Sequence, residues 1–507
     1  MLYHEYIVEE LRVCEKVKVV IPERASTMIE GKRQHFIGGE WCDPVNGRWF
    51  DTADPATGEV LAVVARGDAD DIDHAVSAAR SAFERWGFSD GIERGRLLYA
   101  MAARIRVEAD ELARLETLDN GKPLRQSRID VEVAARYFEF YAGAADKIGG
   151  RTIPVPGAFF DYTMREPLGV CAQIVPWNYP LQIGSRAMAA PLAVGNTVVM
   201  KPAEETPLTL LELARIGSEV GLPPGALNVV SGYGDEAGAA LAAHPDINHV
   251  TFTGSVEVGA AVMKAAAANI VPVTLELGGK SPNVVFASAD LDRAIPIIVN
   301  SIIQNAGQTC SAGARLLVEE AIHEDVVGRM LALFSVLRMG PGIADPDLGP
   351  VISARQYERV QGYLNLAREE GVAARQAIPE DGMPDGYYVP ATLLDGVTPQ
   401  SRIFQEEIFG PVVAVTTFRD EQEAIALANS TAYGLVAAVW TRDVAQAHRL
   451  GRRIQAGQVY VNSYGAGGGV EMPFGGYGKS GFGREKGLDA LQHYTQIKNI
   501  CVYLGAE

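Results

Sequence analysis

Cysteine is scarce in this chain of 507 residues, and its spacing excludes two kinds of site. The five cysteines stand far apart and form no CxxC pair; they are Cys14, Cys42, Cys171, Cys310 and Cys501. Zinc cages and disulfide frameworks both need cysteines at close, regular spacing. We therefore expect no metal site, and the unpaired thiols favour a reducing compartment such as the cytoplasm.

Positive charge and long apolar runs are also missing. The chain has 45 Lys and Arg against 63 Asp and Glu, a formal net charge of −18, and no basic cluster of the kind that binds nucleic-acid phosphates. Its most apolar stretches, 187–194 and 294–303, are interrupted by Pro191 and Pro296 and are too short to cross a bilayer. Neither nucleic-acid binding nor a membrane span is expected.

The first 30 residues lack the features of a targeting peptide. Acidic residues run through this segment without a sustained apolar core, unlike a secretory signal, and it is not rich in arginine, unlike a transit peptide. We interpret residues 1–30 as an N-terminal extension, with Met28 as an alternative natural start.

What the chain does contain is an α/β pattern too long for one hydrophobic core. Apolar residues recur at helical spacing over residues 70–86 and 94–118, which predicts amphipathic helices. Short β-branched runs then alternate with helical segments, which predicts βαβ units around a parallel sheet. These runs are 170–175, 197–202, 226–232, 249–254 and 283–287, with helices at 208–220 and 236–243. A second series, from Ala314 to Val461, predicts a second α/β domain.

The C-terminal segment 490–504, ALQHYTQIKNICVYL, is typical of a strand with exposed apolar side chains. Such a strand at the end of a chain invites pairing with another chain. We interpret it as a contact between the subunits of a homo-oligomer. Alternatively, it completes the sheet of its own domain.

Cys310 is the first candidate for chemistry. It lies in GQTCSAG between Gly307 and Gly313, which allow the backbone to approach a ligand closely. An accessible cysteine at positive potential becomes a thiolate nucleophile. A lone cysteine in a long chain is more often an inert buried residue, so this motif needs support from other segments.

Two segments supply groups that a nucleophilic thiol uses. LELGGKSP (275–282) places Glu276 before a Gly-Gly pair in a loop, where partial burial would raise the pKa of the carboxyl group, as a general base requires. VPWNYP (175–180) holds Asn178, whose amide is a neutral donor suited to an oxyanion. Taken alone, Glu276 is more often a solvated loop glutamate, and Asn178 in a proline-rich turn is commonly ordinary turn chemistry.

Two other segments are candidates for nucleotide contacts. In VVMKPAEETPL (198–208), Lys201 ends a strand and Glu204 follows it, at the carboxyl edge of a parallel sheet where ligands bind. In FTGSVEVG (252–259), Ser255 follows Gly254 and begins a helix whose amide end can face a phosphate. The spacing is GSxxxG, so the GxGxxG fingerprint is absent. A surface ion pair and simple helix capping are the alternatives.

Together and in this order, seven segments resemble the hallmark blocks of the aldehyde dehydrogenase superfamily: PWNYP, KPAEETPL, FTGS, LELGGKSP, GQTCSAG, EEIFGPV and MPFGGYGKSGFGRE. The resemblance extends from about Phe36 to Tyr503. It implies Cys310 as nucleophile, Glu276 as general base, and Asn178 with the Cys310 amide as oxyanion hole. It also implies cofactor contacts at Trp177, Lys201, Glu204, Gly254, Ser255, Gly278, Glu407 and Phe409.

The resemblance further implies a fold class. This is an α/β, aldehyde dehydrogenase-like fold with a Rossmann-type cofactor domain, an α/β catalytic domain and a small β oligomerisation arm. We expect the NAD-binding domain over residues 31–147 and 168–278 and the catalytic domain over residues 279–478. The arm is expected over residues 148–167 and 479–507. A dimer, or a tetramer built as a dimer of dimers, would follow.

The implied reaction oxidises a small-molecule aldehyde to its carboxylic acid. The Cys310 thiolate adds to the aldehyde, the thiohemiacetal loses hydride, and water activated by Glu276 hydrolyses the resulting thioester. Family members that acylate coenzyme A generally lack this glutamate, so hydrolysis is expected. The expected cofactor is NAD, with NADP possible, because a carboxylate at Glu204 bonds ribose hydroxyls and repels a 2′-phosphate.

Two other classes of function remain as alternatives. A cofactor-independent thiol hydrolase or esterase could use Cys310 and Glu276, but it would have no use for Lys201, Glu204 and Ser255. A non-catalytic role on the same scaffold conflicts with the intact set of catalytic residues.

The substrate is the least constrained part of this interpretation. Arg186 occupies the position at which succinic semialdehyde dehydrogenases use an arginine to bind the substrate carboxylate, which favours an acidic semialdehyde. Those enzymes carry a second arginine six residues before the nucleophile, where this chain has Gln304. The alternative is that Arg186 is a surface or ion-paired helix residue. Tyr179, Trp177 and the glycine-rich segment 465–474 would equally suit an aromatic or medium aliphatic aldehyde.

Overall fold

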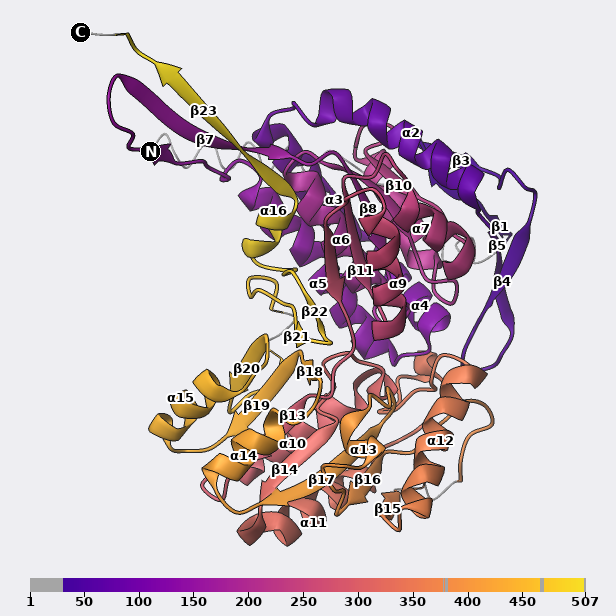
Figure 1. Cartoon of the computed structure of the whole chain (residues 1–507). Helices are drawn as coiled ribbons and strands as arrows, with labels where there is room; N and C mark the ends of the chain where they lie inside the picture. Colours follow the sequence, from indigo (N-terminus) through magenta and orange to yellow (C-terminus); the bar gives the residue numbers. More distant parts are fainter. Residues whose placement is uncertain (1–30, 377, 379–381, 466–468, 506–507) are drawn as a thin grey trace, which may run out of the picture.

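The computed structural model describes residues 31–376, 378, 382–465 and 469–505 of the chain. The predicted N-terminal extension, residues 1–30, lies outside the described residues. Figure 1 shows an upper lobe around an eight-stranded sheet, a lower lobe around a seven-stranded sheet, and a projecting three-stranded arm. This arrangement confirms the predicted α/β class.

The upper sheet has the strand order β22-β12-β11-β8-β9-β10-β2-β3. Its five central strands run parallel and are almost wholly buried, as expected for a sheet covered on both faces. They are β8 (Val170–Ile174), β9 (Thr197–Lys201), β10 (Leu227–Val229), β11 (His249–Thr253) and β12 (Val273–Glu276). The outer strands β2 (His35–Ile37), β3 (Glu40–Cys42) and β22 (Gly481–Phe482) pair antiparallel.

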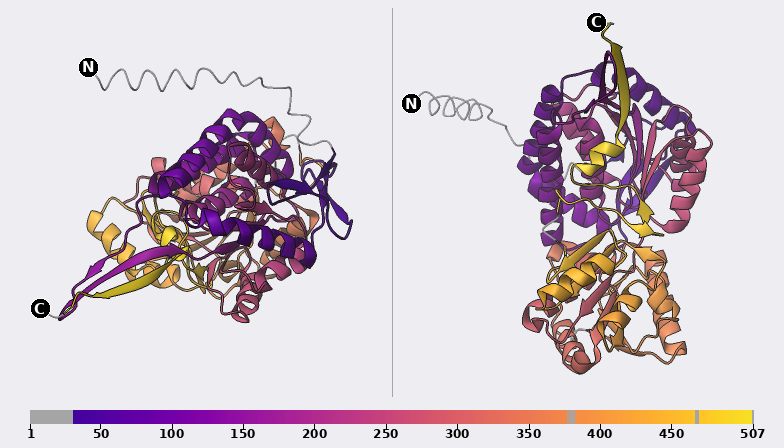
Figure 2. Two further views of the ribbon diagram at one scale, coloured as in Figure 1. Left: turned by 90° about the horizontal axis from the view of Figure 1, so that it is seen from above. Right: turned by 60° about the vertical axis from the view of Figure 1, so that its left-hand side comes forward.

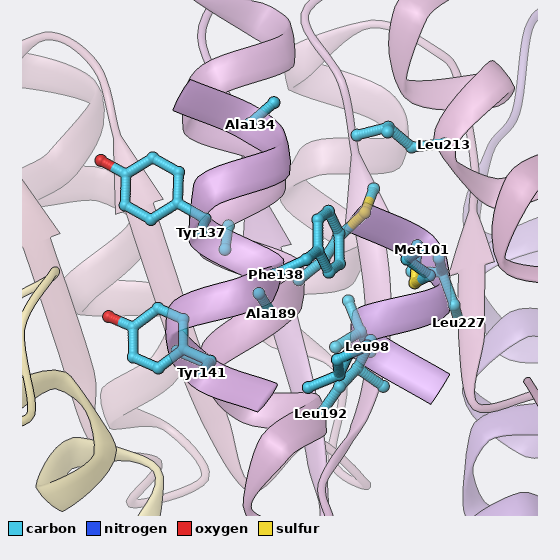
Figure 3. Close-up of a cluster of buried hydrophobic side chains, with 14 of the residues drawn as sticks. Leu98, Met101, Ala134, Tyr137, Phe138, Tyr141, Ala189, Leu192, Leu213 and Leu227 are labelled. Carbon is cyan, nitrogen blue, oxygen red and sulfur yellow. The ribbon is translucent and has the colours of Figure 1, made fainter. Parts of the chain in front are cut away.

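Helices cover both faces of this sheet. One face packs against α2 (Ala69–Trp86), α8 (Ala239–Ala243) and α9 (Val256–Ala267). The other packs against α3 (Gly91–Val107), α4 (Ala109–Asn120), α5 (Leu124–Ala144), α6 (Pro180–Ala193) and α7 (Leu208–Glu219). Successive residues of β8 alternate between the two cores, Val170 in the first and Cys171 in the second. Figure 3 shows the second core, in which Phe138 of α5 lies near Met101 of α3.

The lower sheet has the order β15-β16-β17-β14-β13-β19-β20 and is parallel except for β15. Its strands are β13 (Pro282–Val285), β14 (Arg315–Glu319), β15 (Ala373–Gln376), β16 (Thr392–Asp395), β17 (Val412–Phe418), β19 (Val436–Trp440) and β20 (Gln458–Val461). The helices of this lobe are α10 (Leu291–Ile303), α11 (His323–Phe334), α12 (Ala354–Glu369), α13 (Arg402–Gln405), α14 (Glu421–Ala428) and α15 (Val444–Arg453). This second α/β series has a hydrophobic core of its own.

Two predicted elements differ from the structure. The helical pattern 94–118 is divided into α3 and α4 at Glu108, whose carboxylate pairs with Arg104 and Arg215. The alternating pattern groups the run 283–287 with the first series, although the domain bounds implied by the resemblance do not; it forms β13, which lies between β14 and β19 of the lower sheet. Local alternation identifies a strand but not its partners, because sheet membership depends on pairing between distant segments.

The arm is an antiparallel sheet of β6 (Thr152–Ile153), β7 (Phe159–Pro167) and β23 (Thr495–Tyr503). Both views of Figure 2 show β7 and β23 extending away from the lobes. Exposed apolar side chains lie along it, among them Phe159, Phe160, Met164, Ile497 and Val502. Because β23 pairs with β7, the C-terminal strand completes neither of the two large sheets. The residues just before it, β22 and α16 (Asp489–His493), pack on the upper lobe.

Smaller elements complete the described part of the chain. A three-stranded sheet joins β1 (Lys32–Arg33), β5 (Val60–Ala65) and β4 (Trp49–Ala53), and β18 (Tyr433–Gly434) pairs with β21 (Tyr477–Gly478). Among the described residues, no helix has the length and apolar character needed to span a membrane. The same residues contain no group of three or more His, Cys, Asp or Glu side chains that could hold a metal ion.

Candidate active site

Two cavities meet at Cys310, between the two lobes. We call the first the cleft; it has a volume of about 180 Å³ and is lined by upper-lobe residues such as Gly254 and Glu276 and lower-lobe residues such as Glu407. We call the second the tunnel; it has a volume of about 330 Å³ and lies among α5, α6 and the segments around β19 and β20. Cys310 is the lining residue that both cavities share. A thiol at this position can meet two ligands at once.

The Cys310 loop is held tightly between neighbouring backbones. Asn305 and Ala306 have φ values of 49° and 53°, which residues with a side chain rarely adopt. At Gly307, which has a φ of 74°, a Cβ would lie 2.1 Å from the carbonyl carbon of Gly410. A Cβ at Gly279 would lie 2.5 Å from the Cys310 carbonyl oxygen. The loop is therefore strained and closely packed, a condition common at functional sites.

Asn178 is tied directly to this loop. It precedes α6, and its Nδ2 donates to the carbonyl oxygen of Gln308 at 3.0 Å. Its own carbonyl oxygen accepts from Asn305 Nδ2 at 2.7 Å. A carboxamide nitrogen carries two hydrogens, so one remains for an oxyanion on a carbon bound to Cys310.

Glu276 is the last residue of β12, and so it does not lie in the predicted loop. Its backbone pairs with Thr253 of β11 and Gly481 of β22, which extends the strand up to the Gly-Gly pair. The carboxyl group is buried, and neither of its oxygens has a hydrogen-bond partner among the described residues. Burial raises the pKa of Glu276 well above its usual value; Glu485 raises it further, and Arg186 opposes the shift.

The thiol of Cys310 also needs help to ionise. Burial raises the pKa of Cys310 to about 11, and the Arg186 guanidinium is the strongest opposing influence. Glu407 and Glu276 add to the upward shift. The nucleophile thus depends on cations from the tunnel side, because the carboxyl groups of the cleft disfavour the thiolate.

The floor of the cleft is bare backbone beside a carboxyl group. A Cβ at Gly278 would lie 2.3 Å from Glu407 Oε2, and a Cβ at Gly254 would lie 2.5 Å from the Phe252 ring. Glu407 Oε1 accepts a hydrogen bond from the Gly279 N–H at 2.9 Å, and burial raises the pKa of Glu407 to about 7. A side chain at position 278 would collide with the Glu407 carboxyl group, so only glycine fits there.

Aromatic rings form another wall of the cleft. Trp177 and Phe409 meet edge to face, with ring centroids 5.3 Å apart. Phe409 has a φ of 63°, another strained residue at this site. The apolar wall and the backbone floor together suit a flat ring with polar edges.

The other predicted cofactor residues lie at the carboxyl edge of the upper sheet. Ser255 lines the cleft and caps α9, its Oγ accepting from Val258 N–H at 3.3 Å. Lys201 ends β9, is buried, and lies with its Nζ 3.2 Å from Glu204 Oε2. Glu204 lines a neighbouring cavity of about 310 Å³ that also contains Ser353. Lys201 and Glu204 therefore stand beside the cleft rather than in its lining.

Sequence reasoning missed the residues that α12 contributes. Ser353 caps this helix, and Arg355, Gln356 and Arg359 of its first two turns line the cleft. Arg359 also donates to the carbonyl oxygens of Glu407 and Ile408. No motif marks these residues. The only sequence signal is a capping serine before a basic turn, and it gains meaning once the lower lobe faces the upper one.

The predicted substrate residues lie in the tunnel. Tyr179 is buried and its hydroxyl lies 2.8 Å from Thr309 Oγ1. Arg186 is buried and forms an ion pair with Glu485. Gln304 lines the tunnel as well. The guanidinium of Arg186 thus already has a carboxylate partner within the chain.

Tyr464 and Lys486 were not recognised from sequence as tunnel residues, whereas Phe474 lies in the segment 465–474 that was expected near the substrate. Tyr464 and Phe474 line the tunnel, and Lys486 lies beside them. The first two belong to or adjoin the glycine-rich segment 465–474, of which residues 466–468 lie outside the described part of the chain. Lys486 stands in the block MPFGGYGKSGFGREK, where nothing in the pattern distinguishes it from an exposed lysine.

Comparisons with known proteins show the family to which this chain belongs. The family model described as "Aldehyde dehydrogenase family" matches residues 41–500. The curated relative "Putative aldehyde dehydrogenase DhaS" of Bacillus subtilis (strain 168) is 42% identical over 490 residues, covering 96% of this chain and 98% of the relative.

Solved structures are also similar to this chain over most of its length. A crystal structure of a "Putative Aldehyde Dehydrogenase" from Burkholderia cenocepacia is 53% identical with a TM-score of 0.92, covering 93% of this chain and 100% of that one. The NAD⁺ complex of an aldehyde dehydrogenase from Bacillus cereus is 41% identical with a TM-score of 0.93, covering 96% and 99%. This chain belongs to the aldehyde dehydrogenase family.

Proposed function

We propose that this chain oxidises an aldehyde to the carboxylic acid with NAD⁺, through a thioester on Cys310 that Glu276 helps to hydrolyse. The observation that carries this proposal is the position of Cys310, which lines both the cleft and the tunnel. One cavity can hold the cofactor and the other the aldehyde. The similarity to a solved NAD⁺ complex supports the choice of cofactor.

The cleft and its surroundings fit a dinucleotide. The missing Cβ of Gly278 leaves open backbone beside Glu407, so Glu407, with Phe409 and Trp177, would hold the nicotinamide ribose and ring. The amino end of α9 at Ser255 would face the pyrophosphate. Lys201 and Glu204 would hold the adenosine ribose, which favours NAD over NADP. When bound, the nicotinamide supplies an acceptor for hydride.

The residues around Cys310 carry the first half of the reaction. The thiolate attacks the carbonyl carbon; a C–S bond forms and the carbonyl electron pair moves to oxygen. Asn178 Nδ2 and the Cys310 N–H donate to this oxyanion, each contributing about 2.7–4 kcal/mol in the transition state. After the hydride has left, the carbon is held as a thioester on Cys310.

Glu276 acts in the second half. It removes a proton from water, the hydroxide oxygen attacks the thioester carbon, and the C–S bond breaks to release the acid and the Cys310 thiolate. A base works best when its pKa lies near the working pH. The raised pKa of Glu276 makes its carboxylate a stronger base than that of an exposed glutamate.

We also propose that the arm joins subunits into a dimer or a tetramer. β23 exposes apolar side chains such as Ile497 and Val502, and its pairing with β7 within the chain leaves these side chains uncovered. A second copy would cover them. Sedimentation of a variant ending at Tyr494, compared with the full chain, tests this proposal by a change of mass.

Replacing the nucleophile tests the proposed reaction. Cys310→Ala should abolish NADH formation from any aldehyde while NAD⁺ still quenches the intrinsic fluorescence, to which Trp177 contributes from the cleft wall. Cys501→Ala, at an exposed position on the arm, is the matched control. Continued turnover by the Cys310 variant would refute the mechanism, and loss of NAD⁺ binding would refute the assignment of the cleft.

A further inference from the structure

Lys486 lines the tunnel from a backbone position that disfavours lysine. Its φ is 65°, in the left-handed region where a residue with a Cβ is strained. Hydrogen bonds on both sides hold it there. Glu485 and Phe474 exchange backbone bonds of 2.8 and 2.6 Å, and the Gly487 N–H donates to the Val470 carbonyl oxygen at 2.8 Å. A strained lysine kept beside a reactive thiol is a candidate for function.

The charged ends of Lys486 and Arg186 both lie against the Phe474 ring. Lys486 Nζ is 4.8 Å from the centroid of the Phe474 ring, and Arg186 Cζ is 5.4 Å from the same centroid. All three side chains line the tunnel together with Cys310. The aromatic ring that could attract a positively charged substrate is therefore already in contact with two cations of the chain.

The two cations are suited to different tasks. The Arg186 guanidinium forms a buried ion pair with Glu485, and it could not turn to a ligand without leaving that carboxylate buried and unpaired. An ammonium group has three donors on a flexible stem, so Lys486 can bind a ligand oxygen in addition to its contacts within the chain. Burial, aided by Arg186, lowers the pKa of Lys486 to about 8, so the cationic form still predominates at neutral pH.

Among the described residues that line the tunnel, the one carboxylate, Asp130, does not offset this. Asp130 accepts from the buried Lys122 Nζ at 2.7 Å and from Gln182 Nε2 at 2.9 Å. Both of its oxygens are thus engaged by the chain. Much of the remaining wall consists of neutral hydrogen-bonding side chains, including Gln304 and Gln458, which suit a polar substrate better than a long aliphatic one.

We propose that Lys486 binds the carboxylate of the aldehyde substrate, so that the tunnel selects short aldehydes carrying an anionic group over cationic ones. This inference rests on the proposed function and specifies its substrate class. It moves the carboxylate contact from Arg186, where sequence reasoning placed it, to a neighbouring cation on another segment. Arg186 then orders Glu485 and leaves Lys486 to meet the substrate.

Three aldehydes of different charge test this proposal: 4-oxobutanoate, its neutral methyl ester, and trimethylammonioacetaldehyde. The wild type should have a kcat/KM for 4-oxobutanoate about tenfold or more above that for the ester, because a charge-assisted contact provides a difference of this size. Its kcat/KM for the cationic aldehyde should be the lowest of the three. Lys486→Gln should lose this preference through a higher KM for 4-oxobutanoate alone. Lys486→Arg should keep it. Lys479→Gln, exposed in the same segment, is the matched control.

The backbone strain provides a second variant. Lys486→Gly removes the cation and also relieves the φ of 65°, so it should unfold at the same temperature as the wild type or higher, yet lose the preference for 4-oxobutanoate.

An equal fall in kcat for all three aldehydes in Lys486→Gln, with the preference for 4-oxobutanoate unchanged, would overturn the proposal, because the lysine would then act only on the Cys310 thiolate. A wild type without preference for the anion would overturn it as well. Absence of NADH from every aldehyde would instead refute the proposed function itself.

Discussion

The cleft and the tunnel share Cys310 but are built in different ways. The cleft is assembled largely at the carboxyl ends of neighbouring parallel strands, where Gly254 and Ser255 follow β11 and Gly278 follows β12. The tunnel collects side chains from α5, α6, the Cys310 loop and the chain beyond β19. The position of the cleft follows from the topology of the sheet, whereas the tunnel depends on how separate elements pack together.

The two cavities also differ in charge. The cleft presents the carboxyl groups of Glu276 and Glu407, each with a raised pKa, and the tunnel presents the cations Arg186 and Lys486. Cys310 lies at the boundary between them. The difference teaches that the thiolate is stabilised from the tunnel; under the proposed function, the base that ends the reaction lies on the cleft side.

The largest effect should come from removing the base in the cleft. Glu276→Gln should lower the steady-state rate by about 10²–10⁴-fold, the usual contribution of a general base, while the first turnover still produces NADH. Stopped-flow absorbance separates this burst from the later rate. Glu257→Gln, exposed on α9, is the control, and an unchanged steady rate in Glu276→Gln would assign the base elsewhere.

Asn178 lines the cleft and is bonded to the Cys310 loop, and its loss should have the next largest effect. Asn178→Ala should lower kcat by about 10²–10³-fold with little change in KM, because the donor acts mainly in the transition state. Steady-state kinetics and thermal unfolding should be measured together, since the side chain also holds the Cys310 loop. A kcat close to that of the wild type, with the fold intact, would contradict the assignment.

The tunnel cation should control the ionisation of the thiol. Removing a positive charge disfavours the thiolate, so Arg186→Met should raise the pKa of Cys310 and slow its alkylation by iodoacetamide at neutral pH by about tenfold. Alkylation across pH 6–10 or so in a series of buffers measures the midpoint. The double variant Arg186→Met/Glu485→Gln avoids a buried unpaired carboxylate, and Arg419→Met is an exposed control. A midpoint that does not move upward would contradict activation from the tunnel.

The smallest effect concerns the edge of the cleft. Glu204→Gln removes the charge that repels a 2′-phosphate, so kcat/KM for NADP relative to NAD should rise about three- to tenfold. Initial rates with both cofactors at a saturating aldehyde concentration measure this ratio, with Glu219→Gln as a control on α7. An unchanged ratio would place the adenosine ribose away from Glu204.

Prediction from sequence succeeded where a short motif imposes its own backbone. Gly278 and Gly279 leave room for the Glu407 carboxyl group and the Cys310 carbonyl oxygen, which lie where a Cβ would be. Gly307 of GQTCSAG packs against the Gly410 backbone in the same way. Such contacts restrict residue types locally, so the motifs mark the cleft even before its walls are known. Helices such as α2 and strands such as β9 were equally visible, because their apolar spacing follows the period of each element.

Prediction failed where a residue's meaning depends on a distant partner. Nothing around Arg186 reveals that Glu485 will neutralise it, and nothing around Lys486 shows that it will face Cys310. The strand β13 was recognised, yet its place between β14 and β19 was not. The residues of α12 carry no motif and reach the cleft only because the lower lobe faces the upper one.

By itself, the sequence determined the chemical groups and the class of fold: a thiol, a carboxyl group, an amide donor, and alternating strands and helices. Only the tertiary structure decided which cavity each group lines, that Arg186 forms an ion pair with Glu485, and that Lys486 lines the tunnel. The physical reason is that local spacing controls secondary structure, whereas the field and shape around Cys310 arise from segments that become neighbours only when both lobes are packed.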